Sequence, residues 1–194
     1  MTEADPDRER PWQVLESRYP VADRWLRLRT DVVSSPTGRT LPPCPILETP
    51  DWVDVIALTG ELNVVLVEQY RHGLRQTRTE FPAGTVEVGE EPLAAIKREL
   101  LEETGYASDE WHLLGSAPVN PHVQTNRIHS FLALNARRIA EQDLDDGELI
   151  RTHELPMAEF IDRVQSGAIE LPALQLADLW LLQSRFRFAM TPSA

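Results

Sequence analysis

The chain has 194 residues, of which 31 are acidic and 19 are basic, so its formal net charge is −12. This length supports one full hydrophobic core and a small appendage. The acidic balance argues against nucleic-acid binding, which depends on basic patches that neutralise phosphates. No apolar run approaches the length of a membrane span, and no basic leader precedes an apolar segment. We therefore expect a soluble, unprocessed protein with no membrane partner.

Cys44 is the only cysteine. One cysteine cannot form an intrachain disulfide, so nothing in the sequence marks an oxidising compartment, and we expect a cytoplasmic protein. Cys44 lies among prolines without a local base. We interpret it as a packing residue rather than a nucleophile.

The N-terminal part of the chain is organised differently from the rest. Residues 1–10 are polar and charged, and we expect them to be disordered. Apolar and polar residues alternate over 25–33, as in a strand, and the prolines at 42, 43 and 45 indicate a linker or a sheet edge. We predict a small N-terminal β subdomain over residues 11–47 and a main domain over 48–194.

Two apolar, β-branched runs over 52–58 and 63–70 are separated by a short turn, which predicts a β-hairpin. Later patterns predict strands over 111–117, 128–135 and 149–155, and helices over 157–166 and 171–188. The last helix should pack on the sheet through Leu174, Leu176, Leu179, Trp180 and Leu182.

A helix is predicted from Pro92 to residue 104. Proline suits a first helical position, and Gly105 suits the left-handed residue after a helix end. Leu93, Ile96 and Leu100 recur at intervals of three and four residues, so we expect them to form a buried stripe.

Three carboxylates, Glu99, Glu102 and Glu103, share another face of this helix. Neighbours at such spacing lie roughly 5 to 6 Å apart at their Cβ atoms. This crowding is unfavourable unless a cation lies among the carboxylates, and oxygen ligands of this kind suit Mg²⁺ or Mn²⁺. The alternative is a solvated acidic face in which Arg98 pairs with Glu102.

The residues around this helix form a more specific pattern. Glycine at position 84 is followed, at fixed spacing, by Glu90, Arg98, Glu99, Leu100, Glu102, Glu103, Gly105 and Tyr106. The segment resembles the Nudix box at every defined position, and such a match is very specific. The resemblance implies an α+β fold, an αβα sandwich with a mixed sheet, and hydrolysis of a nucleoside diphosphate linked to another group.

The charge of the chain agrees with a phosphate substrate bridged by metal. Diphosphate hydrolysis builds negative charge on oxygens that are already anionic, and metal ions stabilise that charge. An acidic protein also repels an anionic substrate unless bound cations invert the local field.

Residues 67–74, 80–90 and 114–133 are similar to the ADP-ribose pyrophosphatase branch of this family. The similarity implies Mg²⁺-dependent hydrolysis of ADP-ribose or another ADP-sugar to AMP and ribose 5-phosphate. It also implies a homodimer built through the N-terminal strands. Hydrolysis of GDP-mannose or of many nucleoside diphosphate sugars is the alternative activity. A non-catalytic Nudix-fold ligand sensor is the alternative from another class.

The resemblance also assigns a metal site. Glu99 and Glu103 would be the principal ligands, with assistance from Glu102 and from the backbone carbonyl of Ala83. Arg98 would support the site by holding Glu90 or Glu99 in place.

The remaining assignments concern substrate and base. Arg71 resembles the arginine that reaches the diphosphate, and Glu80 would contact metal-bound water or ribose. Trp25 would stack on adenine, with an exposed or interface tryptophan as the alternative.

The general base is either a glutamate of the box, here Glu102, or a residue on the later acidic loop. Glu148 is the best match on that loop, and Asp145 and Asp146 compete with it. The alternative is a solvated loop with no catalytic role.

Overall fold

The computed structural model describes residues 11–23 and 26–186. Two predictions, the disorder of residues 1–10 and the adenine contact of Trp25, lie outside the described residues. Within those described ranges, no helix is long and apolar enough to cross a membrane.

The chain divides into two compact units, each described by itself below. The N-terminal unit comprises the chain up to Pro50 and the segment Pro118–Arg127. The main unit comprises Asp51–Ala117 and the chain from Ile128 onward. The segment Pro118–Arg127 joins the N-terminal unit because its backbone pairs with the strand β3 (Cys44–Glu48), where the Leu47 amide donates to the carbonyl of Val123 at 2.7 Å. A single domain boundary near residue 47 therefore does not separate the two units, because the N-terminal unit also contains Pro118–Arg127.

The N-terminal unit is an antiparallel sheet of three strands in the order β1 (Gln13–Ala22), β2 (Arg27–Ser34) and β3 (Cys44–Glu48). Pro45 lies within the edge strand β3, opposite Thr30. A proline is tolerated on an edge strand, where one row of amides needs no partner in the sheet. Of the two interpretations of the proline cluster, the sheet edge is the one observed.

The polar side of this sheet is a charge network. Asp31 is only 5% exposed, accepts a hydrogen bond from Ser17 Oγ at 2.7 Å and is paired with Arg29 at 3.0 Å. Arg29 also bonds Glu48 of β3. In contrast, Trp12 and Val14 at the N-terminal end of the sheet are more than half exposed.

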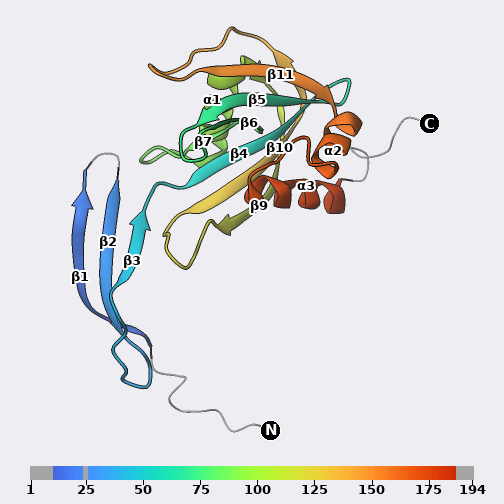
Figure 1. The fold of residues 1–194 in the computed structure, drawn as a ribbon. Coiled ribbons are helices and arrows are strands. Elements are labelled where there is room, and N and C mark those ends of the chain that lie inside the picture. Colours follow the sequence, from blue (N-terminus) through green and yellow to red (C-terminus); the bar gives the residue numbers. More distant parts are fainter. Residues whose placement is uncertain (1–10, 24–25, 187–194) are drawn as a thin grey trace, which may run out of the picture. The chain divides into compact units, whose positions relative to one another are not determined.

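The main unit contains a mixed sheet of eight strands (Figure 1). These are β4 (Trp52–Thr59), β5 (Asn63–Arg71), β6 (Gln76–Glu80), β7 (Ala83–Thr85), β8 (Tyr106–Ala107), β9 (Glu110–Pro118), β10 (Arg127–Arg138) and β11 (Ile150–Pro156). Their central order is β11-β5-β4-β10-β8, with β4 and β10 parallel and β4 and β5 antiparallel. The predicted hairpin is therefore confirmed, as are the three later strands.

The strand β4 changes partner along its length. Its second half pairs with β5, whereas its first half pairs with β7, where Asp54 lies opposite Ala83. This exchange fixes the turn that begins at Ala83 to the middle of the sheet. It places the turn within reach of the first helix.

Three helices cover the sheet: α1 (Pro92–Thr104), α2 (Met157–Gln165) and α3 (Ala173–Arg185). Alternate residues of β4 point to opposite faces. Val53 and Val55 pack in one cluster with Ile96 of α1, whereas Ile56 packs in another with Phe160 of α2. The sheet thus lies between α1 on one face and α2 and α3 on the other, which is the predicted α+β sandwich (Figure 1).

The bounds of α1 agree with the prediction, and Gly105 follows it with φ 74°. The buried stripe was predicted wrongly at one position. Leu93 is 38% exposed because it lies in the first turn, outside the cluster that contains Ile96 and Leu100. Burial begins at Ala95 instead.

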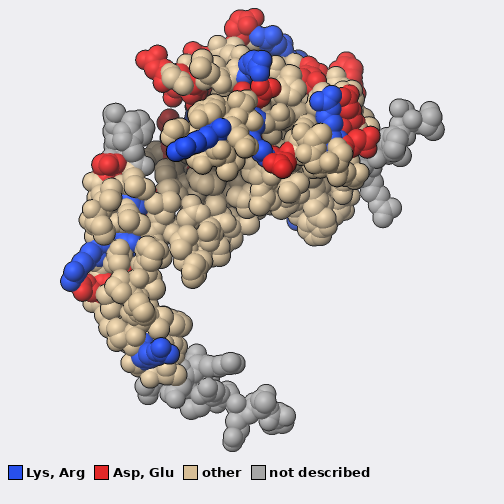
Figure 2. All heavy atoms as spheres, in the orientation of Figure 1, with Lys and Arg blue, Asp and Glu red and all other residues tan. Residues whose placement is uncertain are grey.

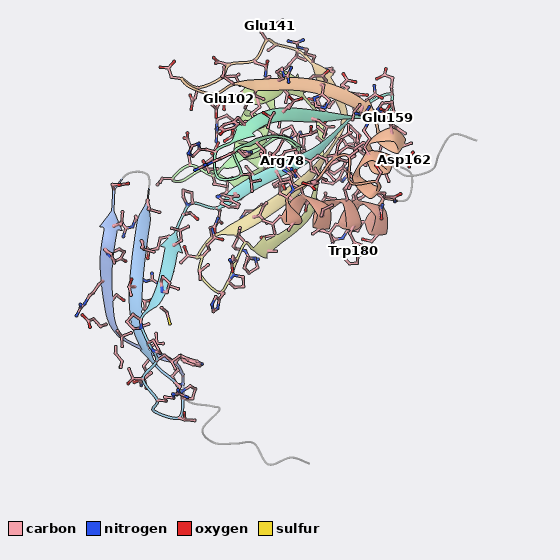
Figure 3. All side chains as sticks on the ribbon, in the orientation of Figure 1. Arg78, Glu102, Glu141, Glu159, Asp162 and Trp180 are labelled. Carbon is pink, nitrogen blue, oxygen red and sulfur yellow. The ribbon has the colours of Figure 1, made fainter. Side chains whose placement is uncertain are left out.

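The prediction for α3 also assigned too many apolar side chains to the buried face. Leu179 and Leu182 are buried, but Leu176 is 45% and Trp180 is 65% exposed. Positions four residues apart share a helix face, and this pair lies on the outer one, from which Trp180 projects (Figure 3). The polar Asp178 occupies a buried position instead.

Candidate active site

The turn after β6, the helix α1 and the acidic loop before β11 surround one pocket of about 410 Å³ in the main unit. Its lining includes Arg71, Ala83, Gly84, Arg98, Glu99, Glu102, Glu103, Asp143, Asp145 and Glu148. Acidic side chains gather over this end of the unit, where Figure 1 places α1 and the segment leading into β11 (Figure 2). The structure therefore brings together residues from four separate segments of the sequence.

The strand β7 and the helix α1 touch at Gly84. A Cβ atom at this position would lie 2.0 Å from Cδ of Glu99, so any side chain would displace that carboxylate. The amide of Thr85 donates to Glu99 Oε1 at 3.3 Å. Glycine lets the backbone pass directly against the observed position of this carboxyl group.

Glu103 is the most deeply buried carboxylate of the pocket, at 5% exposure. It accepts a hydrogen bond from the amide of Ala83 at 3.1 Å. Burial, reinforced by the charges of Glu99 and Glu148, raises the pKa of Glu103 to about 8, although the Ala83 amide opposes the shift. Burial also raises the pKa of Glu99. Both carboxylates lie where a positive charge would stabilise their ionised forms.

Arg98 connects the acidic side chains. It holds Glu90 through two bonds, from Nε at 3.2 Å and from Nη2 at 3.0 Å. Its Nη1 donates to Glu99 Oε1 and to Glu102 Oε2, each at 3.0 Å. The contacts expected of Arg98 with Glu90 and Glu99 and the alternative pairing with Glu102 thus all occur in one network.

Arg71 and Glu80 form a close pair. Arg71 donates to Glu80 Oε2 from Nε at 3.0 Å and from Nη2 at 2.6 Å. Glu80 is 5% exposed and lines a neighbouring pocket of about 360 Å³ instead of the acidic one. Arg71 lines both pockets. The carboxylate therefore orients the arginine that faces the acidic pocket.

Glu148 lies exposed on the acidic loop and lines the pocket. Its Oε2 accepts a hydrogen bond from the amide of Asp145 at 3.2 Å. Asp145 also lines the pocket, whereas Asp146 does not. Among the three candidate bases on this loop, Glu148 and Asp145 are the ones that face the box glutamates.

Comparison with known proteins agrees with this geometry. The model of the NUDIX domain matches residues 49–174, which is most of the main unit. The chain belongs to the Nudix hydrolase family. It is 35% identical over 147 residues to a methanol dehydrogenase activator of Bacillus methanolicus, covering 75% of this chain and 79% of that protein. It is 34% identical over 125 residues to an ADP-ribose pyrophosphatase of Bacillus subtilis (strain 168), covering 64% and 68%.

Among solved structures, an ADP compounds hydrolase superposes with a TM-score of 0.80 at 16% identity. The superposition covers 92% of this chain and 96% of that one. At such low identity the likeness concerns the fold, and the predicted Nudix sandwich is confirmed.

Nudix hydrolases generally use divalent metal ions, and the residues of this pocket fit such an ion. The pocket lining is rich in carboxylate oxygens, which suit a hard cation. In the described ranges, no three acidic or histidine side chains are arranged as a ready-made metal cage. Arg98 holds two of the box carboxylates, Glu99 and Glu102, through hydrogen bonds of 3.0 Å.

Two polar residues near the site were not predicted from the sequence. Gln142 Nε2 and Thr152 Oγ1 both donate to the backbone carbonyl of Glu103, at 2.5 Å and 3.1 Å. Gln142 is 39 residues from Glu103 in the Nudix chain, so no local pattern signals the contact.

Proposed function

We propose that this Nudix protein is a Mg²⁺-dependent ADP-sugar pyrophosphatase that hydrolyses ADP-ribose to AMP and ribose 5-phosphate, with Mn²⁺ as a possible replacement. The convergence of the box carboxylates, the Ala83 carbonyl and Glu148 on one pocket supports the chemistry. The similarity to the ADP-ribose pyrophosphatase supports the choice of substrate.

Glu99 and Glu103 would hold the metal, assisted by Glu102 and the carbonyl of Ala83. The bound ion would supply a polarised water and neutralise charge on the diphosphate. The Arg98 network fixes the orientation of Glu99 and Glu102 before any ion binds. The proposed metal ligand Glu99 and the arginine that fixes its side-chain conformation, Arg98, are thus neighbours on one helix.

Glu148 is the proposed general base, which removes a proton from the attacking water. It lies on the pocket wall and is exposed, so the proton can pass on to solvent. Glu102 is less suited to this role, because its Oε2 already accepts a hydrogen bond from the charged guanidinium of Arg98 at 3.0 Å.

Arg71 is proposed to bind the diphosphate of the substrate, with Glu80 holding its guanidinium in place. A planar guanidinium matches two phosphate oxygens at once. Trp25 is proposed to stack on adenine.

The same proposal includes a homodimer and a cytoplasmic location. Exposed apolar side chains of the N-terminal unit, among them Val14 on β1 and Trp12 just before it, offer a surface for a second copy. The single cysteine suits a reducing compartment.

The test is a substrate panel with separate detection of AMP, GMP and sugar phosphate. We expect AMP and ribose 5-phosphate from ADP-ribose in the presence of Mg²⁺, and a loss of roughly 10²-fold or more in kcat for Glu103→Gln. Preferential release of GMP from GDP-mannose would favour the alternative substrate. Equal, very low turnover by wild type and Glu103→Gln would favour a ligand sensor.

A further inference from the structure

The acidic loop that carries Glu148 is attached to the C-terminal end of α1. A helix end leaves several backbone carbonyls without partners inside the helix. The amide of Asp143 donates to the carbonyl of Glu102 at 3.0 Å, and the amide of Ile139 donates to the carbonyl of Gly105 at 2.9 Å. Glu141, which lies between these two contacts in the chain, is at the same end of the unit as Glu102 (Figure 3).

One side chain joins this helix end to both ends of the loop. Gln142 Nε2 lies 2.5 Å from the carbonyl oxygen of Glu103, 3.2 Å from that of Ile150 and 3.3 Å from Thr152 Oγ1. Two of these partners are carbonyls, which only accept, so the amide nitrogen must face them. Gln142 begins the acidic segment, and Ile150 begins β11 directly after it.

The loop needs such an attachment because charge repulsion opposes its position. Asp143, Asp145 and Glu148 line the same pocket as the three box glutamates. Like charges that line one pocket repel one another. Among the described residues that line this pocket, the only cationic side chains are Arg71 and Arg98, and neither lies on the loop. Arg98 is already bonded to three glutamates, and Arg71 to Glu80.

We propose that Gln142 is a positioning residue for hydrolysis: it holds the acidic loop so that Glu148 faces the metal-binding pocket. This inference rests on the proposed function, in which Glu148 is the base. Gln142 itself is not among the residues that line the pocket. Because a base displaced by about 1 Å can lose on the order of 10²-fold in rate, one lost clamp can change turnover without removing a catalytic group.

The test is a double-mutant cycle of Gln142→Leu and Glu148→Gln, assayed with ADP-ribose and Mg²⁺. Leucine keeps a similar volume but cannot donate. We expect Gln142→Leu to lower kcat by about ten-fold or more in the wild-type background, with KM within about two-fold, and to change kcat by less than about two-fold when Glu148 is already glutamine. Gln142→Lys restores a donor beside the same carbonyls and should recover part of the lost kcat.

The control is Gln165→Leu at the exposed end of α2, which should leave kcat unchanged. Equal losses from Gln142→Leu in both backgrounds, or no loss in the wild-type background, would overturn the positioning role.

Hydrogen exchange gives a readout that does not depend on activity. In Gln142→Leu, amides of residues 143–149 should exchange faster, while amides of α1 stay protected. Unchanged protection of 143–149 would reject the clamp. If the wild-type protein hydrolyses no nucleoside diphosphate sugar, the proposed function fails, and this exchange measurement still decides whether Gln142 holds the loop.

Discussion

At the scale of single residues, the contact between Gly84 and Glu99 ties sequence to chemistry most directly. Gly84→Ala would place a Cβ atom 2.0 Å from the Glu99 carboxyl group. The side chain of Glu99 is flexible and can move away, so we expect little loss of thermal stability. Because Glu99 is a proposed metal ligand, its displacement should lower kcat/KM by roughly 10²-fold.

Gly60→Ala is the matched control for this prediction. A Cβ atom at Gly60 meets no other atom within 4 Å. Steady-state kinetics and thermal melts of both variants make the comparison. Wild-type activity in Gly84→Ala would show that Glu99 need not occupy its observed position.

The raised pKa of Glu103 predicts that the stability of the metal-free protein depends on pH. Its pKa of about 8 lies above the ordinary glutamate value of about 4.3. Between these values the folded state keeps a proton that the unfolded chain releases, so the free energy of unfolding falls as pH rises through this window. The Glu103→Gln variant has no carboxyl group to titrate at this position. Its free energy of unfolding should therefore fall less than that of the wild type as pH rises.

Thermal melts of the wild type and Glu103→Gln in chelator, at about pH 5, 6.5 and 8, measure how stability changes with pH. Added Mg²⁺ should stabilise the wild type increasingly toward pH 8, because Glu103 as the proposed ligand must be deprotonated to bind the ion. The ion should stabilise Glu103→Gln much less. Parallel pH slopes in the two proteins would contradict the assignment.

At the scale of elements, the end of α1 supports the acidic loop through Gly105. This residue has φ 74°, and an added Cβ atom would lie 2.2 Å from the carbonyl oxygen of Ala140. Gly105→Ala therefore combines a left-handed backbone penalty with a backbone clash. We expect destabilisation of more than about 2 kcal/mol, measured by urea unfolding.

Gly167→Ala separates the two effects. Gly167 has φ 77°, but a Cβ atom there meets nothing within 4 Å. Only the backbone penalty of about 1 kcal/mol applies. Equal destabilisation by the two substitutions would mean that the contact with the loop does not restrict Gly105.

The packing of α3 on β4 contains a buried carboxyl pair, Asp54 and Asp178. Burial, followed by repulsion from Asp178, raises the pKa of Asp54 well above its usual value, and burial raises that of Asp178. The folded state therefore retains a proton that the unfolded chain loses above about pH 3.9, and the contribution of the pair to stability falls as pH rises. Asp178→Asn removes one charge and supplies a donor.

We expect Asp178→Asn to melt at a higher temperature than wild type at about pH 8, with a smaller difference at about pH 5. Asp162→Asn on the exposed surface of α2 is the control. A difference from wild type that does not change with pH would rule out the shared-proton explanation.

At the scale of the whole molecule, local signals predicted the parts that are local in sequence. Pro92 and Gly105 bound α1, and the spacing of the box placed Glu99 and Glu103 on one side of it. The spacing of apolar residues in α1 and α3 does not show which helical turns pack against the sheet. For this reason Leu93 and Trp180 were expected to be buried, although both are exposed. Contacts between distant segments, such as Gln142 with Glu103, depend on the sheet that brings β10 and β11 beside α1.

The net charge of −12 makes cation binding central to the whole account, because an anionic substrate must approach an acidic pocket. AMP release from ADP-ribose, measured after removal of metal with a chelator and then during titration with Mg²⁺, tests this most directly. We predict no AMP release without the ion, recovery as Mg²⁺ is added, and little recovery in Glu103→Gln. AMP release at the same rate in chelator and in Mg²⁺ would contradict it.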